Sequence, residues 1–137
     1  MALSLLAGTA GASNATLKAT LDRWSTTIAA DARAVSLAAR QRHPRAMTTA
    51  ALRFRRDALL ARTAIGARRA STLKGRRAKT LALTAYADYA RAGAKWAASG
   101  RARVAHRLLL AAADAKAAAA YARAANRLLV TAGTLLG

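Results

Sequence analysis

The side chains that could do acid–base or metal chemistry are few and scattered in this sequence. The two histidines, His43 and His106, have no second ligand at metal-binding spacing, so no metal site is expected. For His106 an ordinary surface role is favoured over a phosphate contact. The chain contains no GxSxG, P-loop or GxGxxG motif and no cysteine. We therefore expect no enzyme, no catalytic residue and no cofactor.

The acidic residues are five aspartates, with no glutamate. No two of them share a local motif, which argues against a catalytic carboxylate pair. Three directly precede a residue of a predicted core line and have an arginine within reach for pairing: Asp57 with Arg53, Asp88 with Arg91, and Asp114 with Arg107. Asp31 lies on a core line itself. It is either a buried partner of an arginine, fixing the helix register, or a solvent-facing residue on a rotated helix.

The basic residues dominate the composition. Twenty-four lysines and arginines give a formal net charge of +19. Solvated surfaces normally mix charges of both signs. Arginine prevails among these bases, and its planar guanidinium suits phosphate. The composition favours binding to a polyanion over the alternative, a solvated surface whose arginine and alanine reflect GC-rich coding.

The positive charge is concentrated in residues 45–107, which hold sixteen bases and two aspartates. Such a basic patch predicts contacts to nucleic-acid phosphates. No motif that reads bases is present, so little sequence preference is expected. The residues expected to bind nucleic acid are Arg45, Arg53, Arg55, Arg56, Arg62, Arg68, Arg69, Lys74, Arg76, Arg77, Lys79, Arg101 and Arg103.

The elements that must position these bases are predicted to be helices, because alanine, the best helix former, is abundant. Four helices are expected, at about 14–42, 45–71, 76–98 and 101–131, in a single domain of residues 14–132. An apolar segment, 1–13, precedes this domain, and a tail, 133–137, follows it. The boundaries rest on an N-cap at Ser13-Asn14 and on breaks at His43-Pro44, Ser71 to Gly75, and Ser99-Gly100.

Each predicted helix carries a core line of apolar residues spaced four and three apart. The lines are Leu17, Leu21, Trp24, Ile28 and Val35; Met47, Ala51, Phe54, Ala58, Ala61 and Ile65; Ala82, Ala85, Tyr89, Ala92 and Trp96; and Val104, Leu108, Ala111, Ala115, Ala118, Ala122, Ala125 and Leu129. Alanine-rich lines imply close helix approach. Short breaks favour an up-down antiparallel four-helix bundle; the alternative is open helical hairpins completed by oligomerisation.

These features favour a structural protein of a nucleoprotein or virion that binds DNA or RNA backbone. The alternative is a helical subunit of a large assembly, such as a phage particle or organellar complex, whose basic surface meets acidic proteins. A protein lying on an anionic membrane ranks third, because the helix faces hold few large apolar residues. Self-association or other subunits are expected as partners. Residues 1–17 lack the basic start of a signal peptide, so an intracellular or virion interior location is favoured over secretion.

Overall fold

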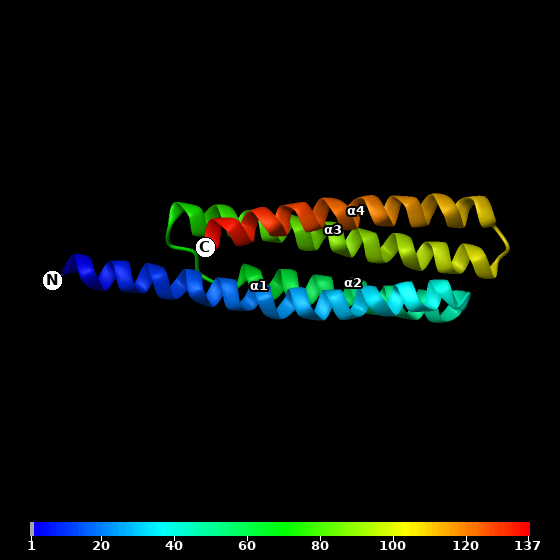
Figure 1. The fold of residues 1–137 in the computed structure, drawn as a ribbon, viewed down its shortest axis with the longest axis horizontal. Coiled ribbons are helices and arrows are strands. Elements are labelled where there is room, and N and C mark those ends of the chain that lie inside the picture. Colours follow the sequence, from blue (N-terminus) through cyan, green and yellow to red (C-terminus); the bar gives the residue numbers. More distant parts are fainter. Residues whose placement is uncertain (1) are drawn as a thin grey trace.

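The computed structural model consists of four helices and, within residues 2–137, no strand (Figure 1). The helices are α1 (Ala2–Arg40), α2 (Pro44–Gly66), α3 (Leu73–Val104) and α4 (Leu108–Leu136). The structure describes the backbone of residues 2–137 and the side chains of residues 13–137. Consecutive helices pack side by side in a bundle-like arrangement (Figure 1), so the expected all-helical fold is confirmed.

Two predicted features of the helix ends agree with the structure. The break at His43-Pro44 is confirmed, because Pro44 is the first residue of α2. Proline lacks an N–H, and an N–H at this position would make no hydrogen bond within the helix. The segment around Ser71 and Thr72 does separate α2 from α3. The Thr72 hydroxyl caps α3 by accepting a hydrogen bond of 2.9 Å from the Gly75 N–H.

Other predicted boundaries are wrong. Ser13-Asn14 lies inside α1 and not at its start, α2 ends at Gly66 instead of near residue 71, and α4 continues to Leu136. Ser99-Gly100 lies inside α3. Its residues serve packing: the buried Ser99 hydroxyl donates to the Ala111 carbonyl at 2.7 Å, and Gly100 lies against the first turn of α2. Here glycine permits a close approach of two backbones instead of a turn.

The turns at residues 41–43 and 105–107 have the same hydrogen-bond pattern. In each, two N–H groups reach back to carbonyls of the preceding helix, as in a Schellman motif: His43 to Ala38, Arg42 to Ala39, Arg107 to Ala102, and His106 to Arg103. The left-handed residues of the two turns are Arg42, with φ 56°, and His106, with φ 58°. Both turns lie at one end of the molecule, hereafter the turn end (Figure 1).

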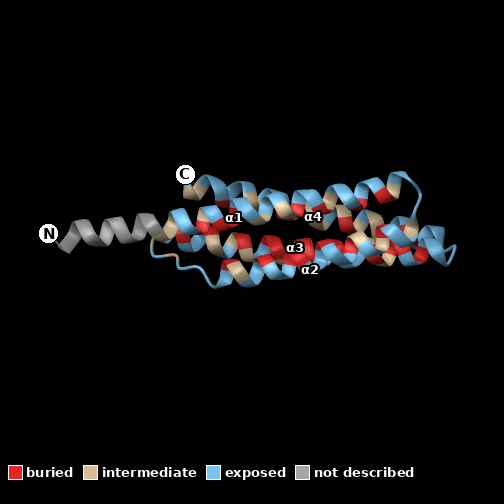
Figure 2. Ribbon diagram, turned by 90° about the horizontal axis from the view of Figure 1, so that it is seen from below, coloured by how far each residue is buried: buried red, intermediate tan, exposed pale blue. Residues whose placement is uncertain are grey.

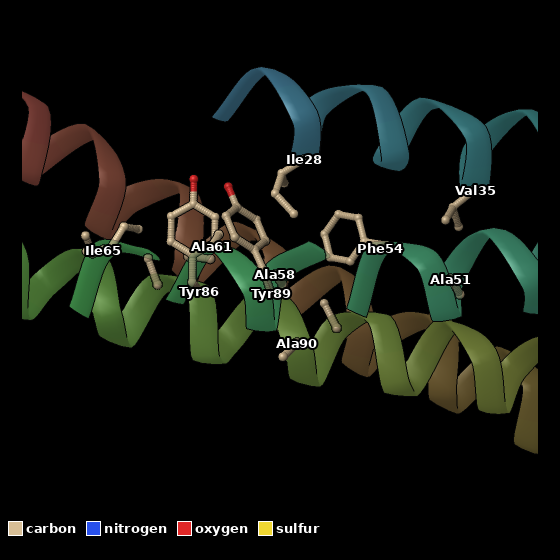
Figure 3. Close-up of a cluster of buried hydrophobic side chains, with 14 of the residues drawn as sticks. Ile28, Val35, Ala51, Phe54, Ala58, Ala61, Ile65, Tyr86, Tyr89 and Ala90 are labelled. Atoms are coloured by element: carbon tan, nitrogen blue, oxygen red, sulfur yellow. The ribbon is translucent and has the colours of Figure 1, made fainter. Parts of the chain in front are cut away.

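The core lines predicted for the first three helices are confirmed. On α1 and α3 their members are buried except for the half-buried Trp24 and Trp96, and on α2 all six are buried. Figure 2 shows buried residues, in red, at intervals along each of the helices. Ile28 and Val35 of α1 point toward α2, where Phe54 and Ala51 lie (Figure 3). The line on α4 begins later than predicted. Val104 and Leu108 are exposed, and burial starts at Ala111 and recurs every seventh residue to Ala132.

An aromatic cluster fills the space that the alanines leave between α2 and α3. The Phe54 ring packs in T-shaped geometry with the rings of Tyr89 and Trp96, with centroid separations of 5.7 and 5.2 Å. Tyr86 packs on Tyr89 at 5.6 Å (Figure 3). Edge-to-face aromatic pairs add to the free energy of burial. These side chains therefore supply large apolar surface in a part of the core where most of the other buried residues are alanines.

The four helices differ in how extensively they pack against their neighbours. α3 packs extensively against both α2 and α4, whereas α1 packs mainly against α2 and touches α4 at few positions. A hollow of about 240 Å³ lies between α1 and α4, lined by Leu21 and Ser25 on one side and by Leu129 and Gly133 on the other. The α1–α4 side is thus the least complete part of the packing.

Candidate nucleic-acid interface

Each of the five aspartates contacts a basic side chain. The pairs are Asp22–Lys18 at 2.9 Å, Asp31–Arg53 at 3.6 Å, Asp57–Arg56 at 3.2 Å, Asp88–Arg91 at 2.8 Å and Asp114–Lys95 at 3.7 Å. Asp31, Asp57, Asp88 and Asp114 expose only 8 to 14% of their side chains. Acidic groups are therefore almost absent from the outer surface of residues 13–137, apart from Asp22.

Asp31 is a buried partner of an arginine, Arg53, which is one of the two alternatives left open for it. Of the three predicted pairings, that of Asp88 with Arg91 is confirmed. The other two are wrong. Arg53 reaches across to Asp31 of α1, which leaves Asp57 to the adjacent Arg56. Arg107 precedes the first turn of α4, and Asp114 pairs instead with Lys95 of α3.

The predicted binding residues are at the surface, but in three separate places. All are exposed except the half-buried Lys79. Arg45, Arg101 and Arg103 lie at the turn end; Arg53, Arg55, Arg56 and Arg62 lie along α2; and Arg68, Arg69, Lys74, Arg76, Arg77 and Lys79 lie in the 67–72 loop or the start of α3. The last group occupies the opposite end of the molecule, hereafter the loop end (Figure 1).

The four arginines of α2 do not form one face. Arg53 and Arg56 contact buried aspartates on the α1 side of the helix. Arg55 and Arg62 lie on the α3 side: the Arg55 backbone abuts Gly93 of α3, and Arg62 lines a shallow hollow with Leu83 of α3. Arg55 and Arg62 have no aspartate partner in the described chain, so their charge is available to an external anion.

The bases of the loop end are held in place by backbone contacts. The Lys79 ammonium donates to the Arg68 carbonyl at 2.7 Å, and the Arg76 guanidinium donates to the Ser71 carbonyl at 2.8 Å. Asn14 of α1 donates to the Thr72 hydroxyl at 2.9 Å. Lys79 and Arg76 of α3 are therefore tied to the loop by hydrogen bonds, which lowers the entropy that these two side chains lose when an anion binds.

The turn end has a hollow of about 510 Å³ between the two turns. Its polar lining consists of His43 and Arg45 from the start of α2 and Arg103 and His106 from the end of α3. Neither histidine is among the residues expected to bind nucleic acid. The sequence feature that could have predicted their proximity is that each histidine lies at a helix break beside arginines.

The structure also contains a pair of buried carboxyl groups that was not predicted from the sequence. Asp31 of α1 and Asp57 of α2 are distant in sequence, but the fold brings their carboxyls together. Burial, together with the neighbouring Asp57 carboxyl, raises the pKa of Asp31 to about 6 against the opposing effect of Arg53 and Arg56. The pair lies between two helices and does not line any of the hollows described here.

Several leucines lie on the surface among the arginines. Leu52, Leu59 and Leu60 are 42 to 50% exposed on α2. At the turn end Leu108 and Leu109 are 66 and 91% exposed. No helix within the described residues combines the length and the hydropathy that a membrane span requires.

The chain matches no protein-family model, no curated protein and no solved structure. Its function is therefore inferred from its own side chains.

Proposed function

We propose that this protein binds the phosphate backbone of DNA or RNA without strong sequence preference, as a non-enzymatic structural component of a nucleoprotein or virion. The observation that carries the proposal is the asymmetry of the charges. Four of the five aspartates are paired and nearly buried, while the bases face outward. A surface of this kind attracts a phosphate lattice and releases its counterions.

The distribution of the exposed bases also fits a nucleic-acid duplex. α2 has 23 residues and is therefore about 34 Å long. Basic clusters stand at both of its ends, with Arg55 and Arg62 between them. One helical turn of B-form DNA measures roughly 34–36 Å. The clusters of the turn end and the loop end are thus spaced to meet phosphates about one turn apart.

The proposal includes an up-down antiparallel order of the helices. Pairs between neighbours support it, because higher residue numbers in one helix meet lower numbers in the next: Tyr89 with Asn126, Lys95 with Asp114, and Ser99 with Ala111. The sparse α1–α4 contact favours the variant in which two hairpins are completed by self-association. Sedimentation over a range of concentrations distinguishes a closed monomer from an assembly of hairpins.

The experiment that tests the proposed function starts from co-purification. The absorbance ratio at 260 and 280 nm is measured before and after a high-salt wash, and the stripped protein is then titrated with two unrelated duplexes and one RNA. We expect a high initial ratio, similar affinities for the duplexes, and a steep loss of affinity with salt. Absence of binding at low salt overturns the proposal.

A second candidate function rests on the exposed leucines. Leu52, Leu59 and Leu60 lie beside Arg55, Arg56 and Arg62 on α2, and phosphate binding gives no role to leucine. A helical subunit of a large assembly would bury these leucines and pair the arginines with acidic protein residues. A well-folded monomer that stays monomeric at high concentration and binds duplexes counts against this candidate. Flotation with anionic liposomes tests the third, a membrane-surface role.

A further inference from the structure

The turn end consists of two helix–helix turns with the same backbone conformation, which lie next to each other. The turns at 41–43 and 105–107 share their hydrogen bonds and their left-handed residue. Between them lie two adjoining hollows, of about 510 and 180 Å³, and His43, Pro44 and Arg103 line both. Arg42 lines the smaller hollow and His106 the larger one. No aspartate lines either hollow.

The residues in the left-handed positions are unusual choices. Glycine occupies this conformation without steric cost, whereas a residue with a Cβ does not. Both turns nevertheless carry a long basic or imidazole side chain there, Arg42 and His106, and both side chains line a hollow. Less favourable backbone conformations of this kind are retained where the side chain has a role.

We propose that the turn end is a binding site for a nucleotide phosphate, either of a free mononucleotide or of the terminal phosphate of a nucleic-acid strand. Arg45 and Arg103 supply fixed positive charge, and the imidazoles of His43 and His106 supply further hydrogen-bonding nitrogens. This site goes beyond the proposed backbone binding, although Arg45 and Arg103 belong to both.

The rest of the lining indicates why the ligand is a nucleotide instead of phosphate alone. Pro44, Ala46 and Val104 give the larger hollow an apolar wall. Its volume of about 510 Å³ is far more than one phosphate fills and lies in the range of small-molecule sites. A base or sugar can rest on this wall and on the histidine rings while the phosphate meets the arginines.

The experiment titrates the full-length protein with adenosine 5′-monophosphate, ribose 5-phosphate and adenosine at about 0.15 M salt, where weak surface binding is screened. Binding is followed by calorimetry and by amide chemical shifts. We expect the monophosphate to bind most tightly, adenosine to bind at least roughly tenfold more weakly, and the shifts to cluster at residues 41–46 and 102–107.

Three variants make the test specific. His106→Gly should raise the melting temperature by roughly 3 °C, because it relieves the left-handed backbone, and should still weaken nucleotide binding. Arg103→Gln should weaken binding roughly tenfold or more. Arg123→Gln removes the same charge from the outer surface of α4 and should leave nucleotide binding unchanged. If His106→Gly has a higher melting temperature and a lower nucleotide affinity, the loss of affinity cannot be caused by unfolding.

The outcomes separate this site from backbone binding. A 5′-phosphorylated decamer that binds more tightly than its 5′-hydroxyl form supports a strand end as the ligand, and equal binding of the two decamers supports a free nucleotide. Equal binding of the monophosphate and adenosine overturns the site, as does an equal loss in Arg103→Gln and Arg123→Gln. Duplex binding by the wild-type protein is measured in a separate titration. The nucleotide site and the proposed backbone binding can therefore be rejected independently of each other.

Discussion

Gly93 of α3 lies directly against the backbone of Arg55 of α2. A Cβ atom at position 93 would be 2.9 Å from the Arg55 nitrogen and 3.0 Å from the Ala51 oxygen. This contact sets how closely the arginine-bearing α2 approaches α3, and with it the position of Arg55 at the border between the two helices.

Gly93→Ala should therefore destabilise the fold. The added methyl meets backbone atoms that cannot rotate away, so α2 and α3 must separate. We expect a loss of roughly 1–3 kcal/mol in the free energy of unfolding, the usual range for an overpacked core. Denaturant unfolding followed by circular dichroism measures it.

Gly133→Ala is the matched control. Apart from the adjoining backbone of its own helix, a Cβ at position 133 in α4 would have no atom within 4 Å, so the substitution meets open space. Alanine has a higher helix propensity than glycine, and we expect a gain of roughly 0.5–1 kcal/mol. A loss of stability in both variants would contradict the close α2–α3 contact as the cause.

Tyr86→Phe should leave the fold as stable or make it more stable. The Tyr86 ring is fully buried and its hydroxyl has no hydrogen-bond partner in the described structure. Burial also raises the pKa of this phenol above its ordinary value. Removing an unsatisfied buried hydroxyl is neutral or favourable by up to about 1 kcal/mol. Thermal melts of the wild type and the variant decide the point; a loss above about 1 kcal/mol would reveal a partner for the hydroxyl.

Asp31 should give the stability an unusual dependence on pH. Its folded pKa of about 6 lies above the ordinary 3.8, so the folded state holds the proton more tightly than the unfolded chain. The contribution of Asp31 to the free energy of unfolding is therefore highest below about pH 4 and falls as the pH rises to about 6, by on the order of 3 kcal/mol.

Asp31→Asn removes this titration and keeps the side-chain shape. We expect the variant to exceed the wild type in stability at pH 7.5 and to approach it near pH 4. The difference between the two free energies of unfolding is measured from pH 4 to 7.5. A constant difference across that range would show that Asp31 does not hold its proton in the folded protein.

The amino-acid pattern was sufficient to predict the helices and most of the core. The 4-3 spacing of apolar residues from Leu17 to Ile65 indicates which faces are buried, because only one face of a helix can meet its neighbour. Pro44 marked a boundary because proline lacks a donor. The break predicted at Ser99-Gly100 was wrong because small residues occur both in turns and at close helix contacts. Only the position of the neighbouring helix distinguishes the two cases.

The candidate site was predictable in composition but not in arrangement. The outward bases follow from the core lines. Which aspartate meets which base depends on the alignment of neighbouring helices, so the Asp31–Asp57 proximity and the Lys95–Asp114 pair could not be read from local spacing. The hollow between the two turns likewise joins residues about 60 positions apart in the chain, such as His43 and Arg103.

The bases of the loop end should be required for nucleic-acid binding. Replacing Arg68, Arg69, Arg76 and Arg77 with glutamate should abolish binding at physiological salt and leave the helix content unchanged, because all four side chains are exposed. Circular dichroism checks the fold, and a gel-shift titration measures the binding. Retained binding would show that these charges are incidental to composition.

If the position of the bases, and not net charge alone, governs binding to the phosphate backbone, two charge-matched variants should differ in the salt dependence of their duplex affinity. One replaces Arg68, Arg69, Arg76 and Arg77 with glutamine; the other replaces Arg33, Lys116, Arg123 and Arg127, which are exposed on α1 and α4. We expect the slope of log affinity against log salt to become shallower by about 3.6 in the first variant and to change little in the second. Equal changes in both variants, or a wild-type protein that binds no duplex at low salt, would contradict this expectation.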